Sequence, residues 1–405
     1  MAKKNLIVLT FWSYKDALIQ TYTLPYLKII RDYTCESKIY LVTLENNKYS
    51  LSSEEKNKIV DHLKAIGIIW IRIPYYTFGM KSIITLISYF PRLLLLSLFK
   101  NVGYIQAFCT PAGALGYFLS VFSGKKLIID SFEPHAESMV ENGTWKIDSL
   151  AFKILFKLEK LQARKAKFLI AANPRMEDYV RERYGHVKAK FFFKPACVDL
   201  NLFSEGRIKN KELVQKFGFE NKIVGVYAGK FGGIYLDREV FDFIRTAQNY
   251  WGDKFRFLIL TSHSDEEILD FCKNAGVNIE HITKMFVPHN EIPDYLGLGD
   301  FGITPVKPVY TKRFCTPIKN GEYWALGLPV VITKDISQDS EIIKRYNIGC
   351  VIEDFTAESY YSVLNKLDEI LKEDKMKLSA RVRKVAVEYR SFSIANKIYS
   401  SIFTN

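Results

Sequence analysis

Short apolar runs of strand length alternate along the whole chain with longer segments whose apolar residues recur at helical spacing. The runs in the first half are residues 6–10, 39–43, 68–73, 104–108, 127–130 and 168–172. The runs in the second half are residues 223–228, 255–260, 299–304, 329–333 and 349–352. Parallel strands that are joined by helices are buried on both faces. The alternation therefore predicts an α/β protein with two doubly wound domains in series.

The two series of strands meet in the segment 194–203. We place a linker near 195–210, between an N-terminal domain of residues 1–200 and a C-terminal domain of residues 205–384. The chain has 405 residues, 48% of them hydrophobic, which is enough to bury two separate cores.

Most of the positive charge lies in the first half of the chain. The net charge is +13; residues 1–200 hold 29 Lys and Arg against 17 Asp and Glu, whereas residues 201–405 hold 28 against 27. Cations that stand beside apolar runs, as around residues 90–100, can hold a domain peripherally against anionic lipid headgroups. A solvated, lysine-rich surface is the alternative. No nucleic-acid recognition module is present, so we expect no nucleic acid partner.

The most apolar stretch, residues 83–99, is interrupted by Pro91 and Arg92, and we expect it to fall short of a membrane span. The six cysteines lie far apart, without the spacing of a metal site or a redox motif, and no cleavable signal precedes the first apolar run. We therefore expect free thiols and a cytoplasmic protein, peripheral at the inner face of the membrane if the basic half binds lipid.

A short helix that contains a carboxylate is predicted around Glu322. Thr316 can cap this helix, Pro317 suits its first position, where no N–H is needed, and Gly327 can end it in the left-handed conformation. The start of such a helix attracts phosphate, while Glu322 can accept hydrogen bonds from hydroxyl groups. Phosphate and diol recognition together indicate a nucleotide. The residues expected to bind this nucleotide at the start of the helix are Thr316, Pro317, Ile318 and Lys319.

The segment 319–332 resembles the signature around the second conserved glutamate of the retaining glycosyltransferases of family 4, particularly members from bacterial polysaccharide clusters. The segment 194–203 resembles the hinge of that family, with Cys197 where glycine is usual. The resemblance implies the GT-B fold, in which two doubly wound Rossmann-like domains face a cleft. It also implies that a last helix, about 385–405, returns to the N-terminal domain.

A glycine-rich turn follows the strand predicted at 223–228. A departing diphosphate must be neutralised by a metal ion or by fixed cations and amide dipoles. No Asp-any-Asp metal motif occurs in the sequence, so we expect no metal. Lys230 would instead face the phosphates, and Gly229, Gly232 and Gly233 would let the backbone approach them. A solvated lysine beside a plain turn is the alternative.

Two positions depart from the family pattern. Phe314 stands where the family has its first conserved glutamate, and many similar relatives carry Ser/Thr-Pro-any-Lys in this region. We therefore expect a change in sugar handling and not a loss of activity. The second cation of the family is missing near Tyr235. Lys319 is the first candidate to replace it, with Arg238, Lys312 and Arg313 as the alternatives.

The segment 285–296 resembles the stretch of the family that contacts the nucleotide base. Phe286 and Val287 are therefore candidate wall residues of the base pocket, with a role in the core as the alternative.

The first domain offers a polar loop after the strand at 127–130, at the edge of the sheet where ligands of such folds bind. By resemblance, this loop faces the reacting centre. His135 is the candidate general base or sugar-orienting group, and Asp130 and Glu133 are candidate acceptor-side residues. A structural role within the loop is the alternative for all three. Asp16 is a further acceptor-side candidate, or it complements a helix dipole.

We therefore predict a retaining, metal-independent glycosyltransferase without a cofactor. It would move a sugar from a UDP- or GDP-linked donor to a glycan or lipid-linked acceptor in surface polysaccharide synthesis, with His135, Lys230 and Glu322 as catalytic residues. The alternative is a nucleotide-sugar epimerase or a catalytically silent GT-B partner protein, for which Phe314 is the main argument. A nicotinamide dehydrogenase is not favoured, because no Gly-any-Gly-any-any-Gly follows a strand.

Overall fold

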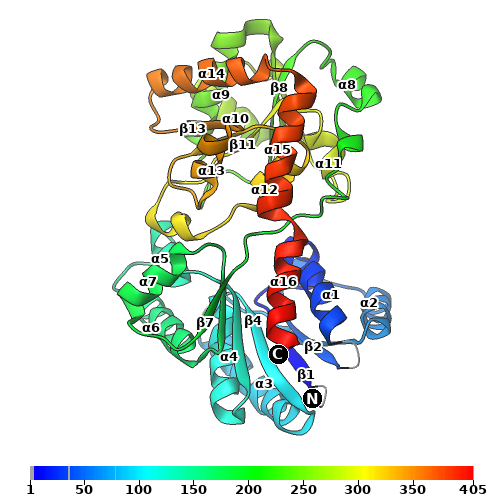
Figure 1. The fold of residues 1–405 in the computed structure, drawn as a ribbon, viewed down its shortest axis with the longest axis vertical. Coiled ribbons are helices and arrows are strands. Elements are labelled where there is room, and N and C mark those ends of the chain that lie inside the picture. The colour runs from blue at the N-terminus through cyan, green and yellow to red at the C-terminus, as the bar shows by residue number, and fades with distance from the viewer. Residues whose placement is uncertain (1–3, 35–36, 78, 405) are drawn as a thin grey trace. The chain divides into compact units, whose positions relative to one another are not determined.

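The computed structural model describes residues 4–34, 37–77 and 79–404. The chain divides into two compact units, of which the N-terminal domain runs to Pro195 and takes in the segment from Ser393 onward. The C-terminal domain is Ala196–Phe392. Each domain is a parallel sheet covered by helices (Figure 1).

The N-terminal sheet has seven parallel strands in the order β3-β2-β1-β4-β5-β6-β7. Its strands are β1 Asn5–Leu9, β2 Ile39–Glu45, β3 Ile68–Pro74, β4 Val102–Phe108, β5 Lys126–Phe132, β6 Phe168–Ala171 and β7 Lys190–Phe193. The helices are α1 Leu24–Tyr33, α2 Ser53–Ala65, α3 Met80–Phe99, α4 Thr110–Ser123, α5 His135–Glu141, α6 Leu150–Lys165, α7 Arg175–Tyr184 and, at the end of the chain, α16 Phe392–Phe403. A π-helical turn, Leu18–Thr23, leads into α1.

The C-terminal sheet has six parallel strands in the order β10-β9-β8-β11-β12-β13. Its strands are β8 Ile223–Ala228, β9 Phe255–Leu260, β10 Ile282–Met285, β11 Phe301–Thr304, β12 Val330–Thr333 and β13 Gly349–Ile352. The helices are α8 Lys211–Phe217, α9 Arg238–Trp251, α10 Asp265–Ala275, α11 Ile292–Leu296, α12 Ile318–Ala325, α13 Asp339–Tyr346, α14 Ala357–Leu371 and α15 Lys375–Arg390. The strand order reverses between β8 and β11, and ligands of open α/β sheets bind at such a switch point.

The predicted fold class is confirmed, since both sheets are parallel and have the Rossmann strand order. All eleven predicted strands are present, with ends that differ by at most two residues. The sequence interpretation missed β7 and β10. Both are edge strands without a fully buried residue, so neither has the buried apolar run that marked the others.

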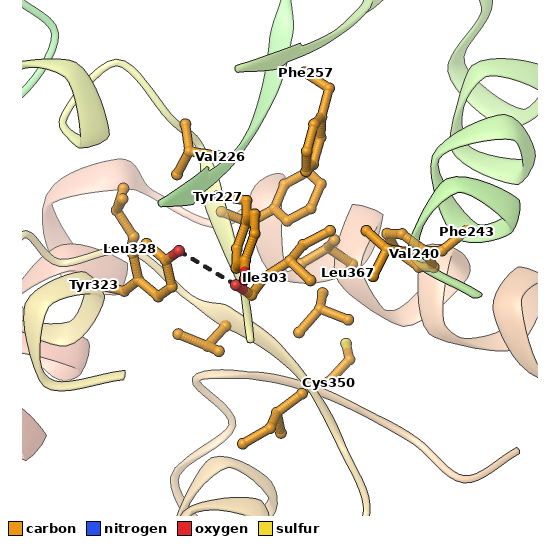
Figure 2. Close-up of a cluster of buried hydrophobic side chains, with 14 of the residues drawn as sticks. Val226, Tyr227, Val240, Phe243, Phe257, Ile303, Tyr323, Leu328, Cys350 and Leu367 are labelled. Atoms are coloured by element: carbon orange, nitrogen blue, oxygen red, sulfur yellow. Dashed lines mark hydrogen bonds between the residues drawn. The ribbon is translucent and has the colours of Figure 1, made fainter. Parts of the chain in front are cut away.

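The core of the C-terminal domain packs α12 directly onto the sheet (Figure 2). The Tyr323 hydroxyl of α12 donates to the Ile303 carbonyl of β11 at 3.2 Å and accepts from the Ala228 N–H of β8 at 3.4 Å. A Cβ atom at Gly302 would lie 2.6 Å from the Tyr323 ring, so glycine is needed for this close approach. Tyr323 therefore fixes α12 at the switch point.

The N-terminal domain contains a fully buried ion pair. Lys194 Nζ lies 3.2 Å from Asp130 Oδ1, and neither side chain is exposed. The other oxygen, Asp130 Oδ2, accepts from the Tyr399 hydroxyl of α16 at 2.5 Å and from Gln106 Nε2 at 3.0 Å. The Lys194 ammonium also lies 3.3 Å from the centre of the Tyr26 ring. This network ties α16 to the sheet.

Helix α3 corrects the interpretation of residues 83–99. Pro91 does not end the helix, which runs unbroken for 20 residues with Pro91 on its exposed side. Among the described residues it is the one helix long and apolar enough to cross a membrane by length and composition, with a mean hydropathy of 1.7 in its most apolar window. Only 11% of that window is buried.

The cysteines that the structure describes are all free thiols, as expected. They are Cys109, Cys197, Cys272, Cys315 and Cys350. Cys35 lies outside the described residues.

Candidate active site

The start of α12 differs by one residue from the prediction. Pro317, with φ −64° and ψ 119°, takes the N-cap position, and Ile318 is the first helical residue. The N-cap position is therefore not the predicted Thr316, and Pro317 itself makes no side-chain capping hydrogen bond. Gly327 follows the C-cap residue with φ +72°, which confirms its predicted place. Because the N-cap proline has no side chain that can accept a hydrogen bond, it leaves the amide groups of the first turn to face the carboxyl edge of the sheet, where an anion can bind.

The glycine-rich turn after β8 lies against Lys319. A Cβ atom at Gly229 would be 2.7 Å from the Tyr227 hydroxyl and 2.8 Å from Lys319 Cε, so a larger residue there would have to displace the Lys319 side chain. Gly232 and Gly233 have φ values of +80° and +64°, the left-handed conformation that glycine adopts without strain. The structure thus brings together the predicted turn and the predicted helix.

Two cations stand at this turn. Lys319 Nζ donates to the Tyr235 hydroxyl at 3.0 Å and lies 4.4 Å from the centre of that ring, in the neighbourhood where the sequence lacks a second cation. Lys230 is exposed, and among the described residues its ammonium group has no hydrogen-bond or ion-pair partner. Its carbonyl accepts from the Tyr227 hydroxyl at 2.5 Å, which fixes the backbone of the turn.

Glu322 is the buried carboxylate of this site. The residue is 9% exposed, and among the described residues its carboxylate has no hydrogen-bond partner. Burial raises the pKa of Glu322 to about 7, against the opposing effect of the Lys319 ammonium. An unpaired buried carboxylate is costly, and donors from a ligand would compensate it.

A buried polar network holds α12 in place, and sequence analysis missed it. The Thr304 hydroxyl donates to Asn320 Oδ1, and Asn320 Nδ2 donates to Asp339 Oδ2, both at 2.5 Å. Asp339 Oδ1 forms an ion pair with Arg390 Nη2, also at 2.5 Å. All four residues are buried, so the network rigidly orients the start of α12.

His263 is a second residue that the sequence analysis missed. The Phe231 N–H donates to His263 Nε2 at 3.0 Å, and His263 Nδ1 lies 3.2 Å from Glu267 Oε1. An accepting Nε2 places the proton on Nδ1, where it can be donated to Glu267. The imidazole therefore supports the glycine-rich turn through the backbone of Phe231. Its position shortly after β9, at the carboxyl edge of the sheet, is the signal that could have identified it.

The two candidate base-pocket residues differ in exposure. Phe286, just after β10, is 73% exposed, whereas Val287 is buried in the core of the domain. Phe286 is therefore the one available to stack on a ligand. Phe314 is also buried, with its ring centre 5.3 Å from that of Tyr310, so an apolar environment surrounds the position of the family's first glutamate.

In the N-terminal domain, His135 and Glu133 lie together. His135 is the first residue of α5, and its Nδ1 is 3.1 Å from Glu133 Oε1. Both side chains are about one-third exposed. The N–H of Ala136, the next residue, donates to buried Glu159 at 2.9 Å, so the start of α5 is anchored beneath His135.

Two acceptor-side candidates have partners within the N-terminal domain. The carboxylate of Asp130 is fully buried and is used by Lys194, Gln106 and Tyr399, so we assign it to the scaffold instead of acceptor binding. Asp16 Oδ1 accepts from the Leu18 N–H at 2.9 Å, at the start of the π-helical turn. This contact agrees with the alternative interpretation, in which Asp16 complements the start of a helix instead of binding the acceptor.

Within the described ranges, no group of three or more His, Cys, Asp or Glu side chains is placed to hold a metal ion. The positive groups at the glycine-rich turn are the side chains of Lys230 and Lys319 and the amides of α12.

A family model described as "Glucosyltransferase 3-like, C-terminal domain" matches residues 254–401, a stretch that contains Glu322 and α12. The match covers less than half of the chain. Together with the two Rossmann-like sheets, it defines the chain as a glycosyltransferase with the GT-B fold.

Solved structures of low sequence identity share this fold over nearly their whole length. HepE of Anabaena, crystallised with UDP-glucose, is 13% identical with a TM-score of 0.71, and the alignment covers 98% of this chain and 99% of HepE. Sucrose-phosphate synthase of Thermosynechococcus elongatus is 12% identical with a TM-score of 0.73, covering 99% and 100%. A glycosyltransferase of Rickettsia africae is 13% identical with a TM-score of 0.69, covering 99% of each chain. No curated protein sequence matches the chain.

Proposed function

We propose that this glycosyltransferase transfers a sugar from a nucleotide-linked donor to a glycan or lipid-linked acceptor, with retention of configuration and without a metal ion. The observation that carries the proposal is the buried carboxylate of Glu322, which lacks a hydrogen-bond partner among the described residues and follows a helix start that has Pro317 as its N-cap and Lys319 in its first turn. The ribose hydroxyls of a nucleotide would supply the missing donors, and its diphosphate would meet the amides and the cations.

The donor nucleotide is UDP or GDP, and UDP is favoured because structures of HepE contain UDP and UDP-glucose. Retention rests on the resemblance of segment 319–332 to the retaining family. The setting that we propose is surface polysaccharide synthesis, in the cytoplasm and at the inner face of the membrane.

In the mechanism that we propose, fixed positive groups replace a metal ion. Lys230, Lys319 and the amides of α12 stabilise the negative charge that develops on the departing diphosphate. The acceptor hydroxyl enters on the face from which the diphosphate leaves, so no covalent nucleophile is required. His135, oriented by Glu133, orients the sugar or takes the acceptor proton.

The test is incubation of the purified chain with UDP-glucose or a GDP-sugar, with and without a membrane extract as acceptor. Acceptor-dependent release of UDP or GDP in the presence of EDTA is the expected result.

A second candidate function is an epimerase or a catalytically silent partner protein. It is favoured by Phe314, which is buried where the family has a glutamate. Sugar isomerisation without nucleotide release, or donor binding without any turnover, would support that candidate.

Replacing Lys230 with Ala should weaken UDP binding about tenfold, because one charge-assisted hydrogen bond to the diphosphate is lost. Uridine, which has no phosphate, should bind both forms equally weakly. Isothermal titration measures both affinities. The matched control is Lys254→Ala, an exposed lysine at the opposite, amino end of strand β9. An equal loss in the two variants would argue against a specific role of Lys230.

Replacing His263 with Ala should weaken UDP binding about fivefold, because the Phe231 N–H loses its acceptor and the glycine-rich turn is less well held. His263→Gln, which can still offer an acceptor, should recover part of the loss. His186→Ala, which removes an exposed histidine of the N-terminal domain, is the control when UDP affinity is measured by isothermal titration. Unchanged affinity in His263→Ala would refute this supporting role.

A further inference from the structure

Helix α3 carries an apolar stripe on its exposed side. An α-helix has 3.6 residues per turn, so Ile84, Ile87, Leu95 and Leu98 share one face. Each of these side chains is between 44% and 64% exposed. The opposite face, with Leu93 and Ser97, is buried in the domain. The apolar stripe is therefore not the side that packs on the sheet.

Helix α4 extends this apolar surface. α3 packs beside α4 in Figure 1, and the rings of Phe90 and Phe122 meet with their centres 5.7 Å apart. Phe118 and Phe122 of α4 are 43% and 64% exposed. We call the set Ile84, Ile87, Leu95, Leu98, Phe118 and Phe122 the α3/α4 surface. A contiguous exposed apolar patch of this kind marks an interaction site.

The charged residues in the part of the chain that forms the α3/α4 surface all have one sign. No Asp or Glu occurs in residues 62–129, whereas the same stretch holds seven Lys and Arg. Lys81 and Arg92 are exposed on the flank of the stripe of α3, Lys100 follows the end of α3, and Lys126 follows α4. A partner must therefore be apolar at its centre and negatively charged around it. An anionic lipid bilayer has this combination, with acyl chains beneath phosphate headgroups.

We propose that the α3/α4 surface docks the N-terminal domain on an anionic membrane, with α3 lying in the plane of the interface. The 20 residues of α3 give a helix about 30 Å long, which presents the stripe along its whole length. The apolar side chains enter the acyl region while Lys81, Arg92 and Lys100 contact the headgroups. The inference builds on the membrane contact in the proposed function and is independent of which donor is used.

The test is sedimentation of the full chain with vesicles of phosphatidylglycerol and phosphatidylethanolamine, compared with phosphatidylcholine vesicles. We expect binding to the anionic vesicles that weakens with added salt. Ile84→Ser/Ile87→Ser should bind about a hundredfold more weakly, since each buried apolar side chain contributes about tenfold. Lys81→Gln/Arg92→Gln should lose about fivefold per cation. The matched control is Leu269→Ser/Val387→Ser, at exposed apolar helical positions of the C-terminal domain.

Three results would overturn the proposal. The first is no binding to anionic vesicles, or the same binding by the apolar variant and the control. The second is an oligomer in solution that the apolar variant dissociates, since a second copy would then cover the surface. The third is retention in cell membranes after alkaline carbonate extraction, which would indicate a spanning helix. UDP binding is measured in every variant and should be unchanged, so failure of the donor proposal is detected separately.

Discussion

Replacing Glu322 with Ala is expected to weaken UDP binding about a hundredfold without unfolding the protein. The ribose would lose two hydrogen bonds to a carboxylate, and hydrogen bonds to charged groups contribute about 1.5–3 kcal/mol each. Glu322→Gln keeps one acceptor of the same shape, so its loss should be smaller, about tenfold. Isothermal titration gives the affinities. Unchanged donor affinity in both variants would contradict the assignment of the nucleotide to this site.

The same glutamate should make the stability of the ligand-free protein depend on pH. Burial raises the pKa of Glu322 from 4.5 to about 7, so from pH 4.5 upward the unfolded chain ionises this group before the folded protein does. The free energy of unfolding therefore falls as the pH rises from 4.5 to 7, because ionisation of Glu322 favours the unfolded chain. Above pH 7 this loss of stability stays constant. A shift of this size corresponds to about 3 kcal/mol.

Glu322→Gln removes the ionisable group and provides the measurement. The free energy of unfolding of this variant, relative to the unmodified chain, should rise from near zero at pH 4.5 to about 3 kcal/mol at pH 7.5. Ribose hydroxyls favour the ionised carboxylate, so the affinity of the unmodified chain for UDP, relative to that of the variant, should also rise over this range. A stability difference that does not change with pH would mean that the carboxylate is solvated or has a partner in solution.

The arrangement of the candidate site was predictable where a local pattern and the strand-order rule were sufficient. The turn at Gly229 follows one strand and the helix that bears Glu322 follows another, and parallel strands place both segments at one edge of the sheet. The predicted N-cap residue of that helix was wrong by one position. Thr316 and Pro317 both suit a helix start, and only the backbone dihedrals decide between them.

The contacts that hold the glycine-rich turn and the buried Asp130 in place could not be predicted from local sequence patterns. His263 meets the N–H of Phe231 across 32 residues, and Tyr399 meets Asp130 across 269 residues. No periodicity in the sequence couples such positions, since each contact depends on the complete packing of its domain. The same reason explains Asp130: a polar loop residue after a strand suggested a ligand contact, but the partners that bury it come from distant segments.

Replacing Lys194 with Met should destabilise the N-terminal domain by about 3–5 kcal/mol. The substitution keeps most of the side-chain volume but leaves Asp130 as a buried carboxylate without its cation, and loss of one partner of a buried pair has this effect. Urea unfolding with hydrogen exchange measured on β5 and α16 reports the loss in this domain. UDP binding by the C-terminal domain should be unchanged.

The double variant Asp130→Asn/Lys194→Met distinguishes a charge effect from a packing effect. It removes both charges, so it should recover most of the stability lost in Lys194→Met, whereas a defect in packing around Tyr26 would persist. A loss below about 1 kcal/mol in the single variant would mean that Asp130 is compensated by its hydrogen bonds from Gln106, Ser131 and Tyr399 without the cation. Strong recovery would instead show that the ion pair secures α16 because neither charge can stay buried without the other.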